Sequence, residues 1–221
     1  MAAFAFLLAP TGSANSMAAQ SPGEGDRDEA LRILQAASER YEGVQAFCGS
    51  FEQEMNVVLL NQVTESHGLL CQARPDRFLM QFHQPAGDVV VADGTHLWVY
   101  FPSTDPGQAF RSDLAASEGR FDFHREFLDD PGQKYEPEYR GEEEMEGRTA
   151  HVIHLTPLEP SPYQEATVWI DGQESLIRKV RIVEENESVR TVVLRDLELE
   201  PEISDDLFEF TPPSGVQVIV R

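Results

Sequence analysis

The chain has 221 residues, of which 41% are hydrophobic and 25% are charged, so it can bury a core and resembles an ordinary globular protein in composition. β-rich folds of this length are commonly one unit, and we therefore expect a single domain. The formal net charge of −22 excludes nucleic acid as a partner, because Lys and Arg would have to replace the counterions of the phosphates.

Residues 1–25 are expected to be a signal-peptide remnant followed by a flexible spacer. The apolar run Ala2–Ala9 precedes the small-residue stretch Thr11–Ala19, an order that is typical of the apolar and cleavage regions of a secretory signal peptide. The run is too short to span a bilayer, and no Lys or Arg precedes Arg27 to form a basic region. The alternative is the tail of an intracellular protein. We predict that the protein is exported and that the signal peptide is cleaved near Ser16-Met17-Ala18.

An amphipathic helix is predicted over Asp26–Glu42. Asp26 stands three residues before Glu29, which is a pattern that starts helices, and Gly43 is suited to ending one. Apolar residues recur at helical spacing in between, at Ala30, Ile33, Leu34, Ala37 and Tyr41.

Strands dominate the rest of the chain. The first run is expected near 46–56, 64–73, 77–83, 88–92 and 96–101, and the second near 135–140, 148–155, 165–171, 176–184, 189–197 and 216–220. Between the runs we expect a loop over Pro102–Gly119 and a short helix or lid over Gly119–Leu128. The acidic cluster of Glu142–Glu144 and Glu146 is interpreted as a solvated hairpin tip and not as a metal site.

The first run of strands carries more apolar side chains than one buried face needs. A sheet with one wet face alternates apolar and polar residues, whereas Phe78–Phe82, Val89–Val91 and Leu97–Phe101 alternate poorly. An antiparallel sheet with a second apolar face is able to hold a lipid, and this is our first hint of function.

The two cysteines, Cys48 and Cys71, lie on the first two predicted strands. If that hairpin turns near Leu59-Leu60, the two residues face each other across the ladder, where a disulfide would contribute about 3 kcal/mol. The alternative is two small buried thiols in a core. Both remain open at this point.

Catalytic and metal-binding motifs are weak throughout the chain. It has no Gly-x-Ser-x-Gly elbow, phosphate-binding loop or zinc-protease helix. His151 and His154 are three apart on a predicted strand, so they point to opposite faces and are poorly placed to chelate one ion. We expect no enzyme, metal or cofactor, and an exported hydrolase with an unrecognised site is a remote alternative.

A series of short motifs follows one order along the chain. They are Phe47-x-x-x-Phe51-x-Gln53, Gly68, Arg74-Pro75, Pro85, Asp93-Gly94-x-x-Leu97-Trp98-x-Tyr100-x-Pro102, Leu155-x-Pro157, the strand Ala166–Ile170 and Phe208-x-Phe210-x-Pro212-Pro213-x-Gly215-Val216. In order and spacing this series resembles the LolA family of periplasmic outer-membrane lipoprotein carriers. Ser103–Glu146 matches that family poorly, and Cys48 and Cys71 are outside its pattern.

The resemblance implies a fold and a function. The fold is α+β and mainly β: an incomplete antiparallel barrel of about eleven strands whose concave hydrophobic side is plugged by helices, forming a single domain over residues 26–221. The function is a monomeric periplasmic chaperone, without a cofactor, that receives triacylated lipoproteins from an inner-membrane ABC transporter and carries them to the outer membrane. An outer-membrane receptor is a further expected partner, although the departures from the family pattern weaken that expectation.

The resemblance also implies roles for particular residues. Arg74 matches the family's arginine that holds a helical lid closed, since a guanidinium offers five donors to lid carbonyls; the alternative is a salt bridge at a strand end. The acyl-chain cavity is expected to be lined by Phe78, Met80, Phe82, Val90, Leu97 and Val99, and closed by Leu34, Phe121, Phe123 and Phe127. For each of these the alternative is ordinary core packing. The alternative function is a periplasmic lipid- or lipopolysaccharide-sensing module of the same fold.

Overall fold

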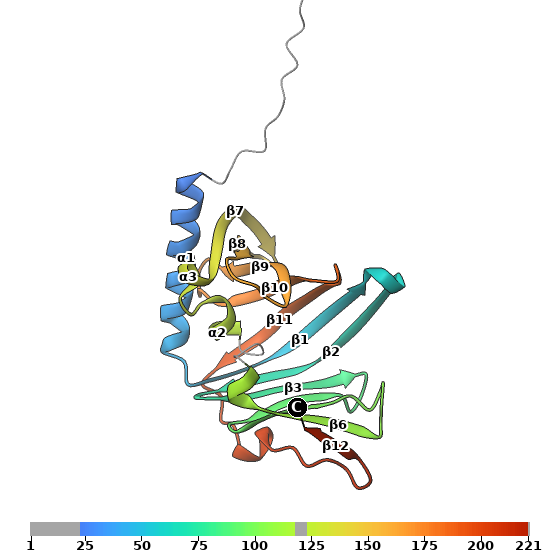
Figure 1. Ribbon diagram of the computed structural model, residues 1–221. Helices are drawn as coiled ribbons and strands as arrows, with labels where there is room; N and C mark the ends of the chain where they lie inside the picture. Colours follow the sequence, from blue (N-terminus) through green and yellow to red (C-terminus); the bar gives the residue numbers. More distant parts are fainter. Residues whose placement is uncertain (1–22, 118–122, 221) are drawn as a thin grey trace, which may run out of the picture.

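The structure, a computed structural model, describes residues 23–117 and 123–220 (Figure 1). Of the predicted signal-peptide remnant and spacer over residues 1–25, positions 1–22 lie outside these residues, and Glu24 and Gly25 belong to the first helix and not to a spacer. The helices are α1 (Glu24–Glu42), α2 (Phe123–Phe127) and α3 (Pro131–Lys134), with the 3₁₀ turns η1 (Val58–Leu60), η2 (Leu114–Ser117) and η3 (Asp205–Phe208). Within this part of the chain, no helix is both long enough and apolar enough to cross a bilayer.

Twelve strands form one open sheet in the order β12-β6-β5-β4-β3-β2-β1-β11-β10-β9-β8-β7. They are β1 (Ala46–Val57), β2 (Gln62–Ala73), β3 (Arg77–Gln84), β4 (Val89–Asp93), β5 (His96–Tyr100), β6 (Gln108–Asp113), β7 (Tyr135–Met145), β8 (Arg148–Pro157), β9 (Tyr163–Asp171), β10 (Ile177–Glu184), β11 (Val189–Leu199) and β12 (Gln217–Val220). Most neighbours are consecutive hairpins, and β1 pairs with β11 to join the two runs. The mainly β, incomplete-barrel prediction is confirmed.

Two details of the predicted sheet are wrong. The stretch Pro102–Gly119, expected to be a loop, contains β6. This strand was not predicted because its residues are mostly polar and show no apolar pattern. The last strand, β12, pairs with β6 in parallel and not in antiparallel, through Gln217↔Gln108 to Val220↔Arg111. The C-terminal residues thus add a strand at the β6 edge, while β7 forms the other edge of the open sheet.

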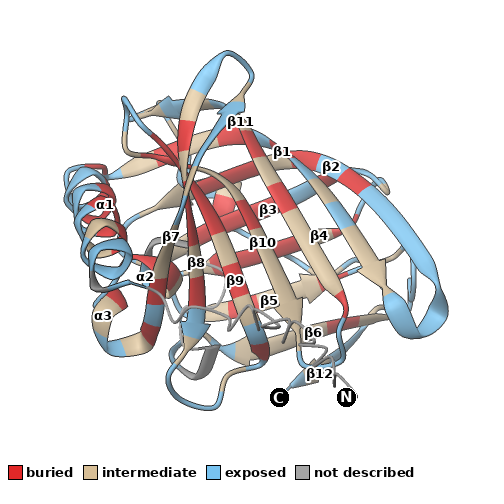
Figure 2. Ribbon diagram, turned by 90° about the horizontal axis from the view of Figure 1, so that it is seen from above, coloured by how far each residue is buried: buried red, intermediate tan, exposed pale blue. Residues whose placement is uncertain are grey.

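Helix α1 presents one apolar side to the sheet. Its buried residues are spaced by three or four, as an amphipathic helix requires: Ala30, Ile33, Leu34, Ala37 and Tyr41. The helix ends at Glu42 with Gly43 as its C-cap, but it begins at Glu24, so Asp26 lies inside the first turn and does not cap it. Figures 1 and 2 show α1, α2 and α3 gathered beside β7.

The strands β3, β4 and β5 bury both of their faces. We call the inner face the one that bears Phe78 and Met80, and the outer face the one that bears Leu79 and Val91; the inner face belongs to the main core. The C-terminal segment Ile203–Phe210 packs on the outer face. The second apolar face that we attributed to a lipid is therefore covered by the chain itself.

Three members of the acidic cluster lie on a strand, whereas the fourth, Glu146, lies at the hairpin turn as predicted. Glu142–Glu144 is exposed within β7 and pairs with β8, and the turn falls at Glu146-Gly147, both of which have positive φ. Its carboxylates accept hydrogen bonds from neighbouring strands: Trp169 Nε1 donates to Glu143 at 2.7 Å. This is a structural role in the sheet.

Candidate functional site

Six of the apolar residues expected to line a cavity share the inner face. The register pairs Met80 with Val90, and Val90 with Val99, so these three residues form one row across the sheet. The neighbouring row pairs Phe78 with Ala92, and Ala92 with Leu97. Phe82 continues the face toward β1, where its ring meets Phe51 edge-on at a centroid distance of 5.1 Å.

This inner face is closed in the structure. Phe78 is 5% exposed, and Met80 and Phe82 are each 8% exposed; Val99 is partly buried against the same cluster. On the helical side the cluster includes Leu34 of α1 and Phe127 of α2, each of which is 0% exposed. Phe121 and the side chain of Phe123 lie outside the described residues.

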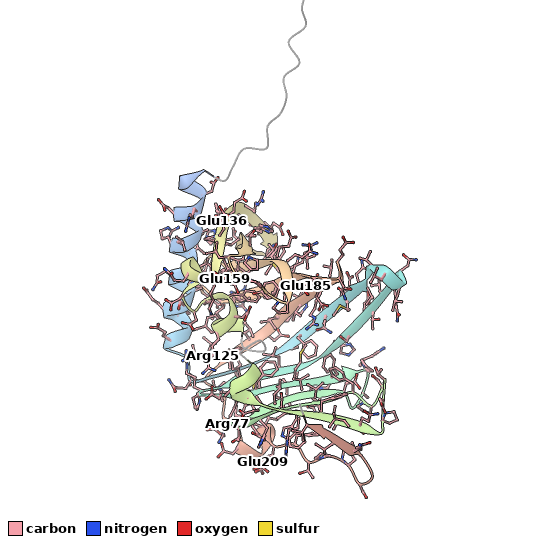
Figure 3. The ribbon with its side chains drawn as sticks, in the orientation of Figure 1. Arg77, Arg125, Glu136, Glu159, Glu185 and Glu209 are labelled. Carbon is pink, nitrogen blue, oxygen red and sulfur yellow. A yellow bond between two sulfur atoms is a disulfide. The ribbon has the colours of Figure 1, made fainter. Side chains whose placement is uncertain are left out.

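Helix α2 is attached to the rest of the molecule by polar contacts at its surface. Arg125, labelled in Figure 3, forms an ion pair with Asp76 of the β2–β3 turn at 2.6 Å. The carbonyl oxygen of Arg125 accepts a hydrogen bond from Lys134 Nζ at 2.5 Å. Phe127 then points its ring into the core next to Tyr135 and Tyr163, at centroid distances of 6.3 and 6.4 Å.

A carboxylate and two phenols hold the inner side of α2. Glu126 accepts hydrogen bonds from the hydroxyls of Tyr163 and Tyr135, and those two hydroxyl oxygens lie 2.6 Å apart. Burial raises the pKa of both phenol groups, and the charge of Glu126 beside them acts in the same direction. Both therefore remain protonated at neutral pH and donate to the helix.

Arg74 connects the β2–β3 turn to the end of α1. Its Nε donates to the carbonyl oxygen of Val44 at 3.0 Å, and its Nη2 donates to that of Tyr41 at 2.9 Å. Its backbone N–H donates to the carbonyl oxygen of Gln45 at 2.8 Å. The carbonyl oxygen of Tyr41 also accepts a hydrogen bond from the Val44 N–H at 3.0 Å, so the guanidinium adds to the cap of α1 and joins it to the residues that lead into β1. In the described part of the chain, the guanidinium forms no ion pair with a carboxylate.

A cavity of about 210 Å³ lies next to these bonds. It is lined by Tyr41, Val44, Gln45, Ala46, Phe47, Gln72, Arg74, Pro75, Arg125 and Asp129. It is smaller than the roughly 300–1,000 Å³ of ordinary ligand pockets. The contacts of α1, of the Arg74 turn and of α2 thus meet around a small gap, and the apolar residues of the inner face lie behind them.

Cys48 and Cys71 are joined by a disulfide across β1 and β2, with their Cα atoms 4.1 Å apart. The hairpin turns through η1, at Val58–Leu60, as the sequence predicts. Both cysteines belong to the outer-face cluster beneath the C-terminal segment, away from the inner face. The disulfide therefore stabilises the sheet that carries the site and does not line the site itself.

The contacts of Glu126, Tyr135 and Tyr163 were not predicted from the sequence. Tyr135 and Tyr163 begin different strands, and Glu126 precedes both in a five-residue helix, so no local pattern relates the three. The sequence carried a signal for the outer-face cover, in the aromatic pair Phe208 and Phe210. Phe210 meets Trp98 at a centroid distance of 5.6 Å.

Comparison with known proteins identifies related sequences over most of the chain. Residues 42–211 match the family model described as "Outer membrane lipoprotein carrier protein LolA". A protein of Alkalilimnicola ehrlichii named outer-membrane lipoprotein carrier protein is 30% identical over 230 aligned positions, which cover 98% of this chain and 94% of that protein. One of the same name from Halorhodospira halophila is 29% identical over 189 positions, covering 84% of each.

Solved structures share the fold at low sequence identity. An uncharacterized conserved protein from Thermus thermophilus superimposes with a TM-score of 0.57 at 12% identity, covering 87% of this chain and 99% of that one. MucB, in the Pseudomonas aeruginosa MucA/MucB complex, gives a TM-score of 0.52 at 19% identity, covering 86% of this chain and 63% of that one. At these identities the likeness concerns the fold alone.

Proposed function

The chain belongs to the LolA family of outer membrane lipoprotein carrier proteins, and on that premise we propose that it binds the acyl chains of lipoproteins between its inner face and its helices. It acts in the periplasm as a chaperone and uses no catalytic residue or cofactor. It receives triacylated lipoproteins from an inner-membrane ABC transporter and delivers them to the outer membrane, where a receptor is a further partner.

The observation that carries this proposal is the way the inner face is covered. Apolar side chains from β3, β4 and β5 belong to the same buried cluster as those of α1 and α2, while α1 itself packs mainly beside β7. Polar contacts fasten the end of α1 and the surface of α2. Such contacts break and re-form without unpacking the sheet. When the helices move aside, the same face is available to acyl chains, and each buried methylene stabilises the complex by about 0.8 kcal/mol.

In this proposal, contacts of Arg74 and of α2 together keep the helices closed over the inner face. Arg74 holds the end of α1, and Glu126 holds α2 against Tyr135 and Tyr163. Phe127 fills the apolar site when no cargo is bound, which prevents the empty face from meeting water. Cargo then replaces Phe127 and its neighbours by apolar groups of another molecule.

The experiment is photocrosslinking to a triacylated lipopeptide. Phe82 of the inner face and Trp98 of the outer face are each replaced by the photoreactive residue benzoylphenylalanine, in the full chain. Both positions are aromatic and lie on β3 and β5, the two strands that flank β4, so the pair is matched. We expect crosslinks from position 82 and none from position 98. Equal crosslinking from both positions, or from position 98 alone, contradicts the proposal.

A second candidate function is binding of a protein partner in response to lipid. It is favoured by the likeness in fold to MucB, which has been solved in a complex with MucA. The present chain spans only 63% of that protein, and its curated relatives carry the carrier name. A lipid-dependent change in affinity for a protein partner, with no transfer of lipoprotein between membranes, would favour this second candidate.

A further inference from the structure

The hairpin of β1 and β2 ends in exposed apolar side chains. Leu59 is 77% exposed, Leu60 69%, Val63 57% and Val58 46%. Four such residues within six positions differ from the scattered apolar residues of an ordinary surface, and groups of this kind mark interaction sites. We call these four residues the apolar tip.

The apolar tip projects well beyond β3 and only a short way beyond β11, which pairs with β1 up to Asn56↔Val189. β2 pairs with β3 only from His67 onward, whereas β1 and β2 pair with each other up to Val57↔Gln62. Figures 1 and 2 both show the end of this hairpin extending away from the helices, and Figure 2 shows it exposed. The apolar tip therefore reaches a partner before the rest of the sheet does.

The apolar side chains occupy the turn and both faces of the hairpin. Val63 lies opposite Asn56 on one face, Val57 lies opposite Gln62 on the other, and Leu59 and Leu60 lie in the turn between them. A protein partner would contact one face of the hairpin and leave the apolar side chains of the other face exposed to water. A medium that is apolar on all sides accommodates the whole tip, and the interior edge of a lipid bilayer is such a medium.

The charges around the apolar tip select among lipid surfaces. Residues 55–64 are uncharged, and the nearest charged residues along the two strands are carboxylates, at Glu54 and Glu65. No Lys or Arg accompanies them in this segment, in a chain whose net charge is −22. Anionic lipids attract basic segments and repel acidic ones, so the charge pattern fits an uncharged, zwitterionic surface.

The backbone at the apolar tip is compatible with partial removal from water. The β1–β2 ladder continues to the last pair before the turn, and Asn61 N–H donates to the carbonyl oxygen of Val58 at 3.1 Å. Because unpaired backbone groups oppose entry into lipid, only the closed turn is suited to insertion, and the outer edge of β2 before His67, which has no strand partner among the described residues, stays in water.

We propose that the apolar tip inserts into the interface of a zwitterionic lipid bilayer and holds the carrier at a membrane during transfer. This inference rests on the proposed function, which gives the contact its purpose. Entry of the turn places the sheet close to the surface from which, or to which, acyl chains move. The interaction is weak and reversible, since four side chains enter and the adjacent basic residue, Arg190 opposite Met55 on β11, is paired with Glu184.

The test is co-flotation of the full chain with phosphatidylcholine vesicles. The variant Leu59→Asp/Leu60→Asp replaces the two most exposed residues of the apolar tip. Leu158→Asp is the control, because Leu158 is also exposed but lies between β8 and β9. Each leucine contributes about tenfold to partitioning, so the double variant is expected to bind roughly a hundredfold less well, or not measurably. The control binds as the unaltered chain does.

Three results of the flotation assay overturn the inference: equal flotation of the double variant and the unaltered chain, no flotation of the unaltered chain, or stronger binding when phosphatidylglycerol is added. Self-association of the chain that is lost in the double variant, seen by analytical ultracentrifugation without vesicles, would also overturn it and identify a second copy as the partner. Binding of a triacylated lipopeptide is measured in parallel. The double variant is expected to retain it; if the unaltered chain floats but binds no lipopeptide, the proposed function fails and the membrane contact stands.

Discussion

Replacement of Arg74 by methionine tests whether the end of α1 is a releasable cover. Methionine keeps the apolar length of the side chain and removes both donors, at 3.0 and 2.9 Å from the carbonyls of Val44 and Tyr41, while the backbone bond to Gln45 is unaffected. A hydrogen bond with a charged partner contributes about 1.5–3 kcal/mol, and the lower figure applies to this partly buried site. The two together give about 3 kcal/mol, or roughly a hundredfold shift toward opening.

The assay is amide hydrogen exchange followed by mass spectrometry, in the absence of lipid. Opening of α1 is expected to raise exchange in the peptides that cover the α1–β1 junction by roughly a hundredfold in Arg74→Met. The matched control is Arg77→Met. Arg77, labelled in Figure 3, pairs with Asp205 at the surface, where such pairs contribute about 0–1 kcal/mol.

Two results would refute this reasoning. The first is exchange at the junction that is the same in Arg74→Met, Arg77→Met and the unaltered chain. The second is a uniform rise in exchange over the whole sheet, with a free energy of unfolding lowered by the full amount. In that case Arg74 anchors the fold, and α1 does not open independently.

Three further predictions concern the frame that supports the site. The double variant Cys48→Ala/Cys71→Ala is expected to lose about 3 kcal/mol of the free energy of unfolding, measured by urea denaturation, because the bridge closes a loop over 23 positions. Gly68→Ala is expected to lose about 1–3 kcal/mol or more in the same assay, because an added Cβ would lie 1.9 Å from the carbonyl oxygen of Gln81. For Asp171, burial acts to raise the pKa, but hydrogen bonds from backbone N–H groups and an arginine hold it below its ordinary value. Its contribution is present above about pH 4 and is lost as the pH falls through the lowered pKa, so Asp171→Asn is expected to flatten the acid end of the stability profile.

Each of these predictions has a contradicting result. Equal stability of the unaltered chain with and without reductant would show that the disulfide adds nothing to the fold. An unchanged Gly68→Ala would mean that β2 and β3 separate easily at their bulge. An acid transition of the same steepness in Asp171→Asn would assign the acid sensitivity of the fold to other carboxylates.

The parts of the fold that the sequence predicted rest on short-range patterns. The helical spacing from Ala30 to Tyr41 locates α1, and alternation places Phe78, Met80 and Phe82 on one side of β3. The hairpin that turns near Leu59-Leu60 fixes the register of β1 and β2. In each case the residues that specify the element are close together along the chain.

The failures concern contacts between distant segments. β6 has a mixed sequence and forms a strand because β5 and β12 flank it, and β12 comes from the far end of the chain. The segment that covers the outer face, Ile203–Phe210, also comes from the far end of the chain. For this reason the sequence alone attributes the apolar excess of β3–β5 to a bound lipid. Apolar patterning reports that a face is buried, but it does not report what buries it.

Native mass spectrometry of the chain, purified from the periplasm with its bound partners, tests the central claim most directly. We expect a one-to-one complex with a triacylated lipoprotein, which dissociates when a triacylated lipopeptide is added in excess. Recovery of the chain with partners that carry no acyl groups, or with lipoproteins that are not displaced by the lipopeptide, would contradict it.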